Sequence, residues 1–239
     1  MRERRAAYMP LCHKCGRYAE YLDVESGRWL CAKCIASIVE YKFLRGIRLA
    51  KPRRGDNLVM VCRGDLQSYY ALKTLIKVEK AYEVTIEAIE LAPQPLCEEL
   101  CEEEGIKYCF EEAKHDTYTD FRLAVLARLR GARDPLLVMP DALEDLAVYA
   151  MSEVWLGDLR GLLLDMLFRV SYPLSGVSVK ALALLEPRLA ARLPPAYLLA
   201  SSRELLEELS RSTPSLPYSA VEALFELTAK LRKKSIKTS

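Results

Sequence analysis

The pattern of apolar and polar positions changes at residue 57. From there, apolar runs of strand length alternate with segments of helical periodicity. Strands are predicted at 57–62, 83–91, 106–113 and 134–140, and helices at 67–81, 95–105, 120–132 and, as one long helical region, 143–167. Strands that alternate with helices pair in parallel through right-handed crossovers. The pattern therefore predicts a doubly wound α/β sheet, whose ligand site lies beyond the carboxyl ends of its strands.

The segments on either side of this alternation have different patterns. Ile35, Ile38 and Val39 predict an amphipathic helix that ends near Pro52. From residue 169 the chain is rich in leucine, alanine and proline, which predicts helices with irregular connections. A last helix over 219–234 leads into a basic tail that we expect to fray. We divide the chain into a module at 1–36, a basic linker helix at 37–56, an α/β domain at 57–168 and a helical region at 169–239.

Composition narrows the class of protein. The chain has 239 residues, of which 51% are hydrophobic, enough for one domain of ordinary size and a small appendage. The net charge is +2, so any contact with nucleic acid must come from local patches. No signal pattern follows Met1, and no apolar run approaches the ~18 residues of a membrane helix, so we expect a cytoplasmic protein. One asparagine, two glutamines and 28% charged residues favour a hyperthermophilic, archaeal source.

Four cysteines near the N-terminus form the most specific motif. Cys12, Cys15, Cys31 and Cys34 make two C-x2-C pairs that are separated by fifteen residues. Two such pairs can complete a tetrahedral shell around zinc, and a closed shell is structural because it leaves no open coordination position. Between the pairs the sequence predicts a hairpin with its turn at Ser26-Gly27. The alternatives are two disulfides or free thiols, and we predict a zinc-ribbon-like module.

The other cysteines have no such spacing. Cys97 and Cys101 are four residues apart in a predicted helix and share a face, so with Cys109 they could bind a metal or form a disulfide. Free cysteine more often packs as a small apolar residue, which is what we expect for them. Cys62 follows a predicted strand at the start of a helix. It is either a thiolate that the helix dipole activates or, as we favour, a packed residue.

A basic segment follows the cysteine motif. Six positive charges lie within thirteen residues: Lys42, Arg45, Arg48, Lys51, Arg53 and Arg54. They are either a solvated helix face or a contact for the phosphate backbone of a nucleic acid, and the sequence favours neither.

The order of these features resembles a known family. A double C-x2-C motif, a basic helix, and then a strand, a turn at Gly64 and a helix are found in this order in the TtuA-type tRNA 2-thiouridine synthetases of the PP-loop ATPase superfamily. Further likenesses lie at Leu143, Asp145 and Ala147, at Gly157-Asp158-Leu159 and at Pro217-Tyr218-Ser219. The resemblance implies a PP-loop (HUP-like) sheet and enzymes that use ATP to adenylate a tRNA base before they deliver sulfur. The family's C-terminal zinc module is absent from this sequence.

The phosphate loop departs from the family pattern. The family's S-G-G-K-D-S becomes Cys62, Arg63, Gly64, Asp65, Leu66 and Gln67, and only Gly64 matches. Arg63 replaces a glycine whose backbone N–H would approach phosphate, although its guanidinium could supply one positive charge. Asp65 places a carboxylate where a lysine would neutralise the phosphate. We therefore predict a remnant of a nucleotide loop, at which the binding of ATP and magnesium is weakened or lost.

Two other family motifs are altered. The family's G-H-N becomes Pro140-Asp141-Ala142, and the acidic pair that follows is Glu144 and Asp145. This pair is either a Mg2+ site or the first turn of a helix, where carboxylates complement the dipole, and we favour the helix start. The resemblance also implies three iron–sulfur ligands, but residues 115–122 contain no cysteine and Leu216 stands in the third position. We expect no iron–sulfur cluster.

These observations leave three functions open. The resemblance and the departures favour a non-catalytic paralogue of the thiolation enzymes that binds tRNA, or that pairs with an active paralogue or a second copy of itself. The first alternative is an ATP-dependent tRNA-modifying enzyme that uses Arg63, Glu144 and Asp145 in an altered loop. The second is a zinc-stabilised protein-interaction module that has no RNA partner.

Overall fold

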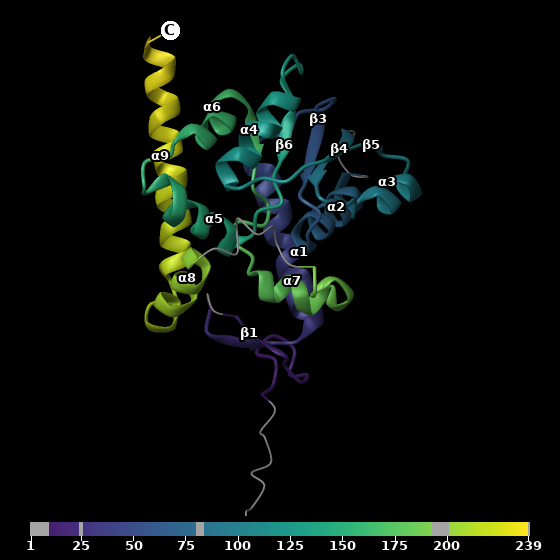
Figure 1. Ribbon diagram of the computed structural model, residues 1–239. Coiled ribbons are helices and arrows are strands. Elements are labelled where there is room, and N and C mark those ends of the chain that lie inside the picture. The colour runs from purple at the N-terminus through teal and green to yellow at the C-terminus, as the bar shows by residue number, and fades with distance from the viewer. Residues whose placement is uncertain (1–9, 24–25, 80–83, 193–200, 239) are drawn as a thin grey trace, which may run out of the picture.

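The computed structural model describes residues 10–23, 26–79, 84–192 and 201–238 (Figure 1). Parts of several predicted segments lie outside these ranges. They are residues 1–9 and 24–25 of the N-terminal module, the end of the helix at 67–81, the start of the strand at 83–91, and residues 193–200 and 239 of the helical region.

A five-stranded parallel sheet forms the centre of the fold. Its strands are β3 (Asn57–Cys62), β4 (Thr85–Ala92), β5 (Lys107–Glu112), β6 (Leu136–Val138) and β7 (Arg169–Ser171). The order across the sheet is β5-β4-β3-β6-β7, and every neighbouring pair is parallel. The chain first builds outward from β3 to β5 and then returns to the other side of β3. The predicted doubly wound sheet is confirmed, and its switch point lies at the carboxyl ends of β3 and β6.

Helices cover both faces of the sheet. They are α1 (Ala32–Leu49), α2 (Leu66–Glu79), α3 (Glu98–Glu104), α4 (Tyr118–Arg128), α5 (Leu143–Tyr149), α6 (Leu163–Leu167), α7 (Val179–Leu185), α8 (Ser201–Ser212) and α9 (Leu216–Thr238). Strand β3 supplies both cores, because successive side chains of a strand point to opposite faces. Leu58 and Met60 pack with α1, α2 and α7, whereas Val59 and Val61 pack with α4, α5 and α9.

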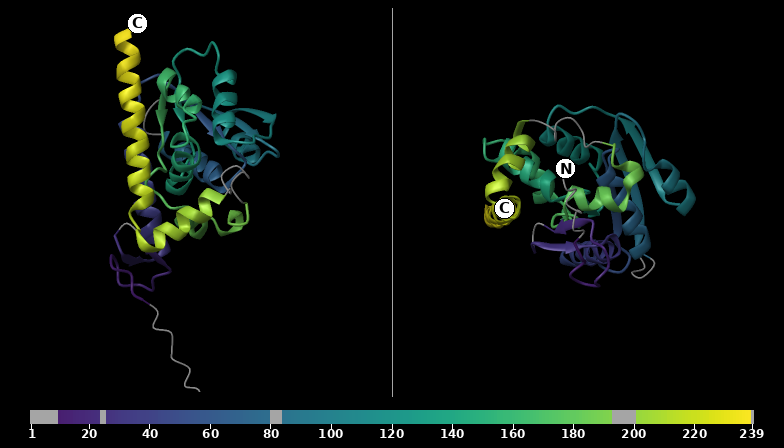
Figure 2. Two further views of the ribbon diagram at one scale, coloured as in Figure 1. Left: turned by 60° about the vertical axis from the view of Figure 1, so that its left-hand side comes forward. Right: turned by 90° about the horizontal axis from the view of Figure 1, so that it is seen from below.

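The N-terminal module lies at one end of the molecule, and α1 leads from it to the sheet (Figure 2). Its strands β1 (Tyr21–Asp23) and β2 (Arg28–Leu30) pair antiparallel, which confirms the predicted hairpin. Gly27 has a φ of 64°, in the left-handed region that favours glycine. The module shares the core on the α1 side of the sheet, so the two parts are packed together.

The long helical region that the sequence predicts over 143–167 is broken in the structure. After α5 the chain continues as a π-helix (Ala150–Val154). Residues 155–159 are not helical, and a 3-10 helix (Arg160–Leu162) then leads into α6. Gly157 lies in this break with a φ of 97°, a conformation that a helix does not accommodate. The leucine-rich pattern did not reveal the break, because apolar residues continue through it.

Two other predictions for the C-terminal region are wrong. The sequence assigns residues from 169 to a helical region, but 169–171 form the edge strand β7, which is too short to show a period. The basic tail, which the sequence predicts to fray, is helical in the structure as far as Thr238, the last described residue. None of the helices within the described residues combines the length and the apolar character that a membrane crossing requires.

Candidate functional site

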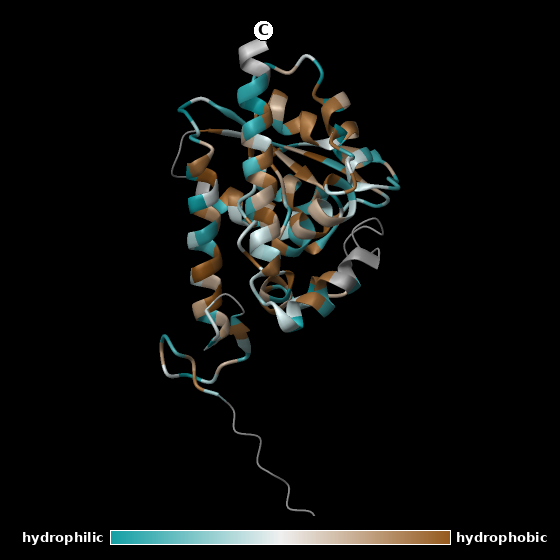
Figure 3. Ribbon diagram, turned by 90° about the vertical axis from the view of Figure 1, so that its left-hand side faces the viewer, coloured by the Kyte–Doolittle hydropathy of each residue, from teal (hydrophilic) through white to brown (hydrophobic). Residues whose placement is uncertain are grey.

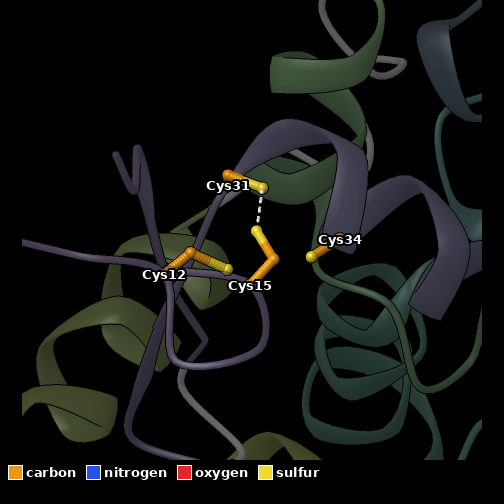
Figure 4. Close-up of side chains that lie close together, drawn as sticks. All are labelled: Cys12, Cys15, Cys31 and Cys34. Carbon is orange, nitrogen blue, oxygen red and sulfur yellow. Dashed lines mark hydrogen bonds between the residues drawn. The ribbon is translucent and has the colours of Figure 1, made fainter. Parts of the chain in front are cut away.

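Four cysteine side chains converge at the base of α1 (Figure 4). Cys12 and Cys15 lie on the loop before β1, where Gly16 turns the chain with a φ of 72° and donates its N–H to the Cys12 carbonyl at 2.8 Å. Cys31 and Cys34 lie at the start of α1. The four sulfur atoms are within 4.8 Å of one another. A zinc ion with bonds of about 2.3 Å to four sulfurs needs them roughly 3.8 Å apart, so the group fits a tetrahedral metal ion after a small contraction.

The electrostatics of this group suit a cation. The Arg17 side chain donates to the sulfurs of Cys15 and Cys31 at 3.4 and 3.6 Å. Arg17 lowers the pKa of Cys15 to about 6, so this thiol is readily deprotonated. Burial and the three neighbouring thiols raise the pKa of Cys34 to about 12. Four thiolates repel one another, and a divalent cation at their centre would offset that repulsion. The cluster can therefore hold a metal ion.

The turn after β3 is internal to the protein. Gly64 has a φ of 75°, and a Cβ there would lie 2.8 Å from the Ala92 Cβ and 3.1 Å from the Gln94 carbonyl oxygen. The end of β4 therefore closes over the turn. The side chains of Cys62, Arg63, Asp65 and Gln67 are all buried. A phosphate group could reach them only if this packing opened.

Two backbone N–H groups at the turn, those of Arg63 and Ser68, are bonded to protein side chains. Asp65 immediately precedes α2 and accepts from the Ser68 N–H at 2.9 Å and from the Ser68 hydroxyl at 2.6 Å. The same hydroxyl accepts from the Arg63 N–H at 2.8 Å. A phosphate loop needs such N–H groups directed toward the ligand. Here Ser68 and Asp65 take the place of the anion.

The Arg63 guanidinium lies at the centre of three carboxylates. Its distance is 2.8 Å to Asp65, 2.6 Å to Asp141 and 3.1 Å to Asp145, and all four side chains are buried. With one positive and three negative groups, the cluster carries a net charge of −2 when every carboxyl is ionised. Burial raises the pKa of Asp141, an effect that the charge of Arg63 opposes. An anion that entered this cluster would be repelled.

The acidic pair at 144–145 lies in the first turn of α5, where each carboxylate has protein partners. Glu144 accepts from the Ser178 hydroxyl at 2.5 Å and from the Val179 N–H at 2.9 Å, and so holds the start of α7. Asp145 accepts from the Ala142 N–H at 3.1 Å and from the Gln67 amide at 3.1 Å. These contacts position α2, α5 and α7 at the switch point of the sheet.

The remaining cysteines lie in and beside the sheet. Cys62, Cys97 and Cys101 are buried in one core. Burial raises the pKa of Cys62 well above its ordinary value, and the nearby Cys97 thiol adds to the shift. The half-buried Cys109 accepts from the Arg128 side chain at 3.0 Å. All of these cysteines are free.

The basic residues lie along α1 and the loop that follows it. Arg45, Arg48, Lys51, Arg53 and Arg54 have exposed side chains. Lys42 is half-buried, and its ammonium donates to the Gly176 carbonyl oxygen at 2.7 Å, so one of the six charges has a structural role.

The structure has a second buried arginine, Arg122, that the sequence analysis did not identify. Arg122 of α4 pairs with Asp165 and donates to the Gly161 carbonyl oxygen at 2.9 Å. Its guanidinium also lies over three rings, 5.5 Å from Tyr118, 5.3 Å from Tyr149 and 5.8 Å from Tyr172. No sequence signal distinguishes it, because an arginine on a short amphipathic helix is ordinarily exposed.

Comparison with known proteins finds solved structures of similar fold. No family model and no curated protein matches the chain. The U34-tRNA thiolase NcsA from Methanococcus maripaludis, solved with its [4Fe-4S] cluster, aligns over 92% of this chain and 87% of its own with a TM-score of 0.72 and 19% identity. An NH3-dependent NAD synthetase from Campylobacter jejuni, in complex with nitrate, aligns over 84% and 95% with a TM-score of 0.45 and 12% identity. The first likeness shows a shared fold, and the second is too distant to support an argument.

Proposed function

We propose that this chain is a PP-loop protein related to the tRNA-thiolation enzymes, that its nucleotide site is closed, and that it binds tRNA without thiolating it. It acts alone, as a homodimer or beside an active paralogue. The main support is the Arg63 cluster, in which three buried carboxylates surround the one cation of the loop and side chains bond the N–H groups of Arg63 and Ser68. The fold shared with a tRNA thiolase and the exposed basic residues of α1 support an RNA partner.

A closed nucleotide site predicts no response to nucleotides. A ligand that binds only the folded state stabilises it by about 2.7 kcal/mol at a hundredfold excess over Kd. Because the nucleotide site is closed, we expect neither ATP with magnesium nor AMP to raise the midpoint of thermal unfolding. Differential scanning fluorimetry, with tRNA present and absent, is the measurement. Stabilisation by ATP, or AMP release with tRNA, would support the enzymatic alternative instead.

The proposal assigns a structural zinc ion to the four-cysteine cluster. All four ligands are thiolates, which suit Zn2+, and the set leaves no position for a substrate or a water molecule. The ion would join the loop that carries Cys12 and Cys15 to the start of α1. It would thereby fix the direction in which α1 and its basic residues leave the module.

The proposal places the tRNA contact on the basic surface of α1 and the following loop. We expect the double substitution Arg48→Glu and Arg53→Glu to weaken tRNA binding. The slope of log K against the logarithm of the salt concentration should become shallower by about one for each phosphate that is no longer neutralised. Both side chains are exposed, so the fold is retained. Fluorescence anisotropy with labelled tRNA at several salt concentrations measures both quantities.

A matched control separates a local contact from overall charge. Arg130→Glu with Arg133→Glu changes the net charge by the same amount at exposed positions after α4. We expect this pair to bind tRNA nearly as the wild type does. Equal reductions in affinity in the two variants, or unchanged affinity in the first at low salt, would contradict the assigned surface.

A further inference from the structure

A groove of about 350 Å3 lies between α1 and α9. Figure 3 shows the two helices side by side, both running away from the N-terminal module. Gly46, Leu49 and Ala50 form one wall, and α9 forms the other. Val170, Ser171 and Tyr172 of the edge strand β7 and the residue after it form the floor. The volume falls within the range of small-ligand pockets and is sufficient for one nucleotide.

The α9 wall is a single stripe of the helix. Phe225, Thr228, Ala229 and Arg232 follow the i, i+3, i+4, i+7 spacing that places side chains on one face. Phe225 is 38% exposed, although it lies beside Tyr172 with a ring-centre distance of 5.6 Å. A partly exposed phenylalanine at the mouth of a groove offers a flat apolar surface on which another ring can stack.

Basic side chains lie at one end of the groove, whereas the exposed Glu222 lies one turn before Phe225 on the same face of α9. Arg232 lies in the lining and Lys233 is exposed next to it, at the end of α9 that Figure 3 colours as hydrophilic. On the opposite helix, Arg45 lies one turn before the lining residue Leu49 and therefore on the same face. The one acidic residue in the lining, Asp165, is paired with Arg122 and accepts from the Tyr172 hydroxyl at 2.6 Å. The groove thus offers a stacking surface between two basic helix ends.

We propose that this groove holds an unpaired nucleotide of an RNA, with its base stacked on Phe225 and its phosphates between Arg45 and Arg232. Single-stranded nucleic acid is bound elsewhere by this combination of aromatic faces and a basic channel. A basic protein ligand is less suited, because Arg232 in the lining and Arg45 and Lys233 nearby would repel it. The inference rests on the proposed RNA-binding function and specifies which feature of the RNA is recognised.

The test uses the full chain and a single-stranded oligouridylate of about ten nucleotides. We expect Phe225→Leu, which keeps an apolar side chain but removes the ring, to weaken binding of this RNA about 5- to 150-fold, the effect of removing one stacked base. Binding of a fully paired, blunt-ended RNA duplex is expected to change little. Phe225→Tyr retains a ring and is expected to bind as the wild type does.

Trp155→Leu is the matched control, since Trp155 is also exposed, at 54%, but does not line the groove. A second readout needs no variant. An oligouridylate with one 5-iodouridine, irradiated in complex with the wild type, is expected to cross-link to Phe225 or Tyr172, as mapped by mass spectrometry.

The outcomes separate this inference from the function on which it rests. If tRNA binds and is weakened by the Arg48 and Arg53 substitutions, but Phe225→Leu has no effect on the oligouridylate and the cross-link maps elsewhere, the groove assignment is overturned and the proposed function stands. If the wild type binds no RNA at all, both are overturned. Preferential binding of a polyglutamate peptide over RNA would likewise refute the groove assignment.

Discussion

Replacing Arg63 with methionine is expected to lower the free energy of unfolding by about 3–5 kcal/mol, because it leaves three buried carboxylates without their cation. Methionine retains the unbranched, flexible stem of the side chain, so the destabilisation comes mainly from the loss of the guanidinium and its charge. The measurement is urea unfolding monitored by circular dichroism. Arg130→Met, at an exposed position, is the control and is expected to change the free energy by less than about 0.5 kcal/mol.

The pH dependence of this destabilisation is a sharper test than its size. Burial already raises the pKa of Asp141 in the folded state and the charge of Arg63 opposes this, so without Arg63 that pKa rises further above its unfolded value. A group of that kind contributes stability while it is protonated, and this stability is lost as the pH rises through the folded-state pKa. The deficit of Arg63→Met should therefore be smaller in acid than at neutral pH. A deficit that is independent of pH would show that Arg63 stabilises the protein by packing alone.

Removal of the metal is expected to be the most disruptive change in the N-terminal module. We expect one zinc ion per chain by metal analysis, and loss of the hairpin when a strong chelator removes it or when Cys31 is replaced by serine. Structural zinc contributes about 10–16 kcal/mol to comparable small modules. Trp29 of β2 reports the change by fluorescence, with Trp155 replaced to remove the second tryptophan signal.

Cys109→Ser is the control for this experiment, because Cys109 lies outside the cluster and contacts Arg128 instead. It is expected to keep the metal and the fluorescence of the wild type. The effect of the Cys31 substitution should extend into α1, since Cys31 precedes its first turn and Cys34 lies within it. A metal-free chain of undiminished stability would refute the zinc assignment.

The sequence was sufficient where the information is local. The two C-x2-C pairs predict a cysteine cluster because each pair folds back within a few residues, and the structure brings all four sulfurs together. The alternation of strands and helices likewise predicts the parallel sheet, and strand β3 has the predicted bounds. These features depend on spacing and periodicity, which are properties of the chain itself.

The partners of Arg63 could not be predicted in the same way. Asp141 and Asp145 are 78 and 82 residues away in the sequence and meet Arg63 only at the switch point of the sheet. The sequence alone allows the positive charge of Arg63 to contact a phosphate. In the structure that charge instead contacts three buried carboxylates. The groove between α1 and α9 was missed for a similar reason, because its walls are 175 or more positions apart and β7, its floor, has too few residues to form a pattern.

Helix α1 joins the N-terminal module to the candidate RNA-binding groove as one unbroken rod. Its 18 residues span about 27 Å, from the cysteine cluster to the mouth of the groove. Because a continuous helix bends little, the distance between these two points is fixed before any partner arrives. A nucleic acid that touches both must therefore supply two features at that separation, so the helix would select partners by their dimensions as well as by their charge.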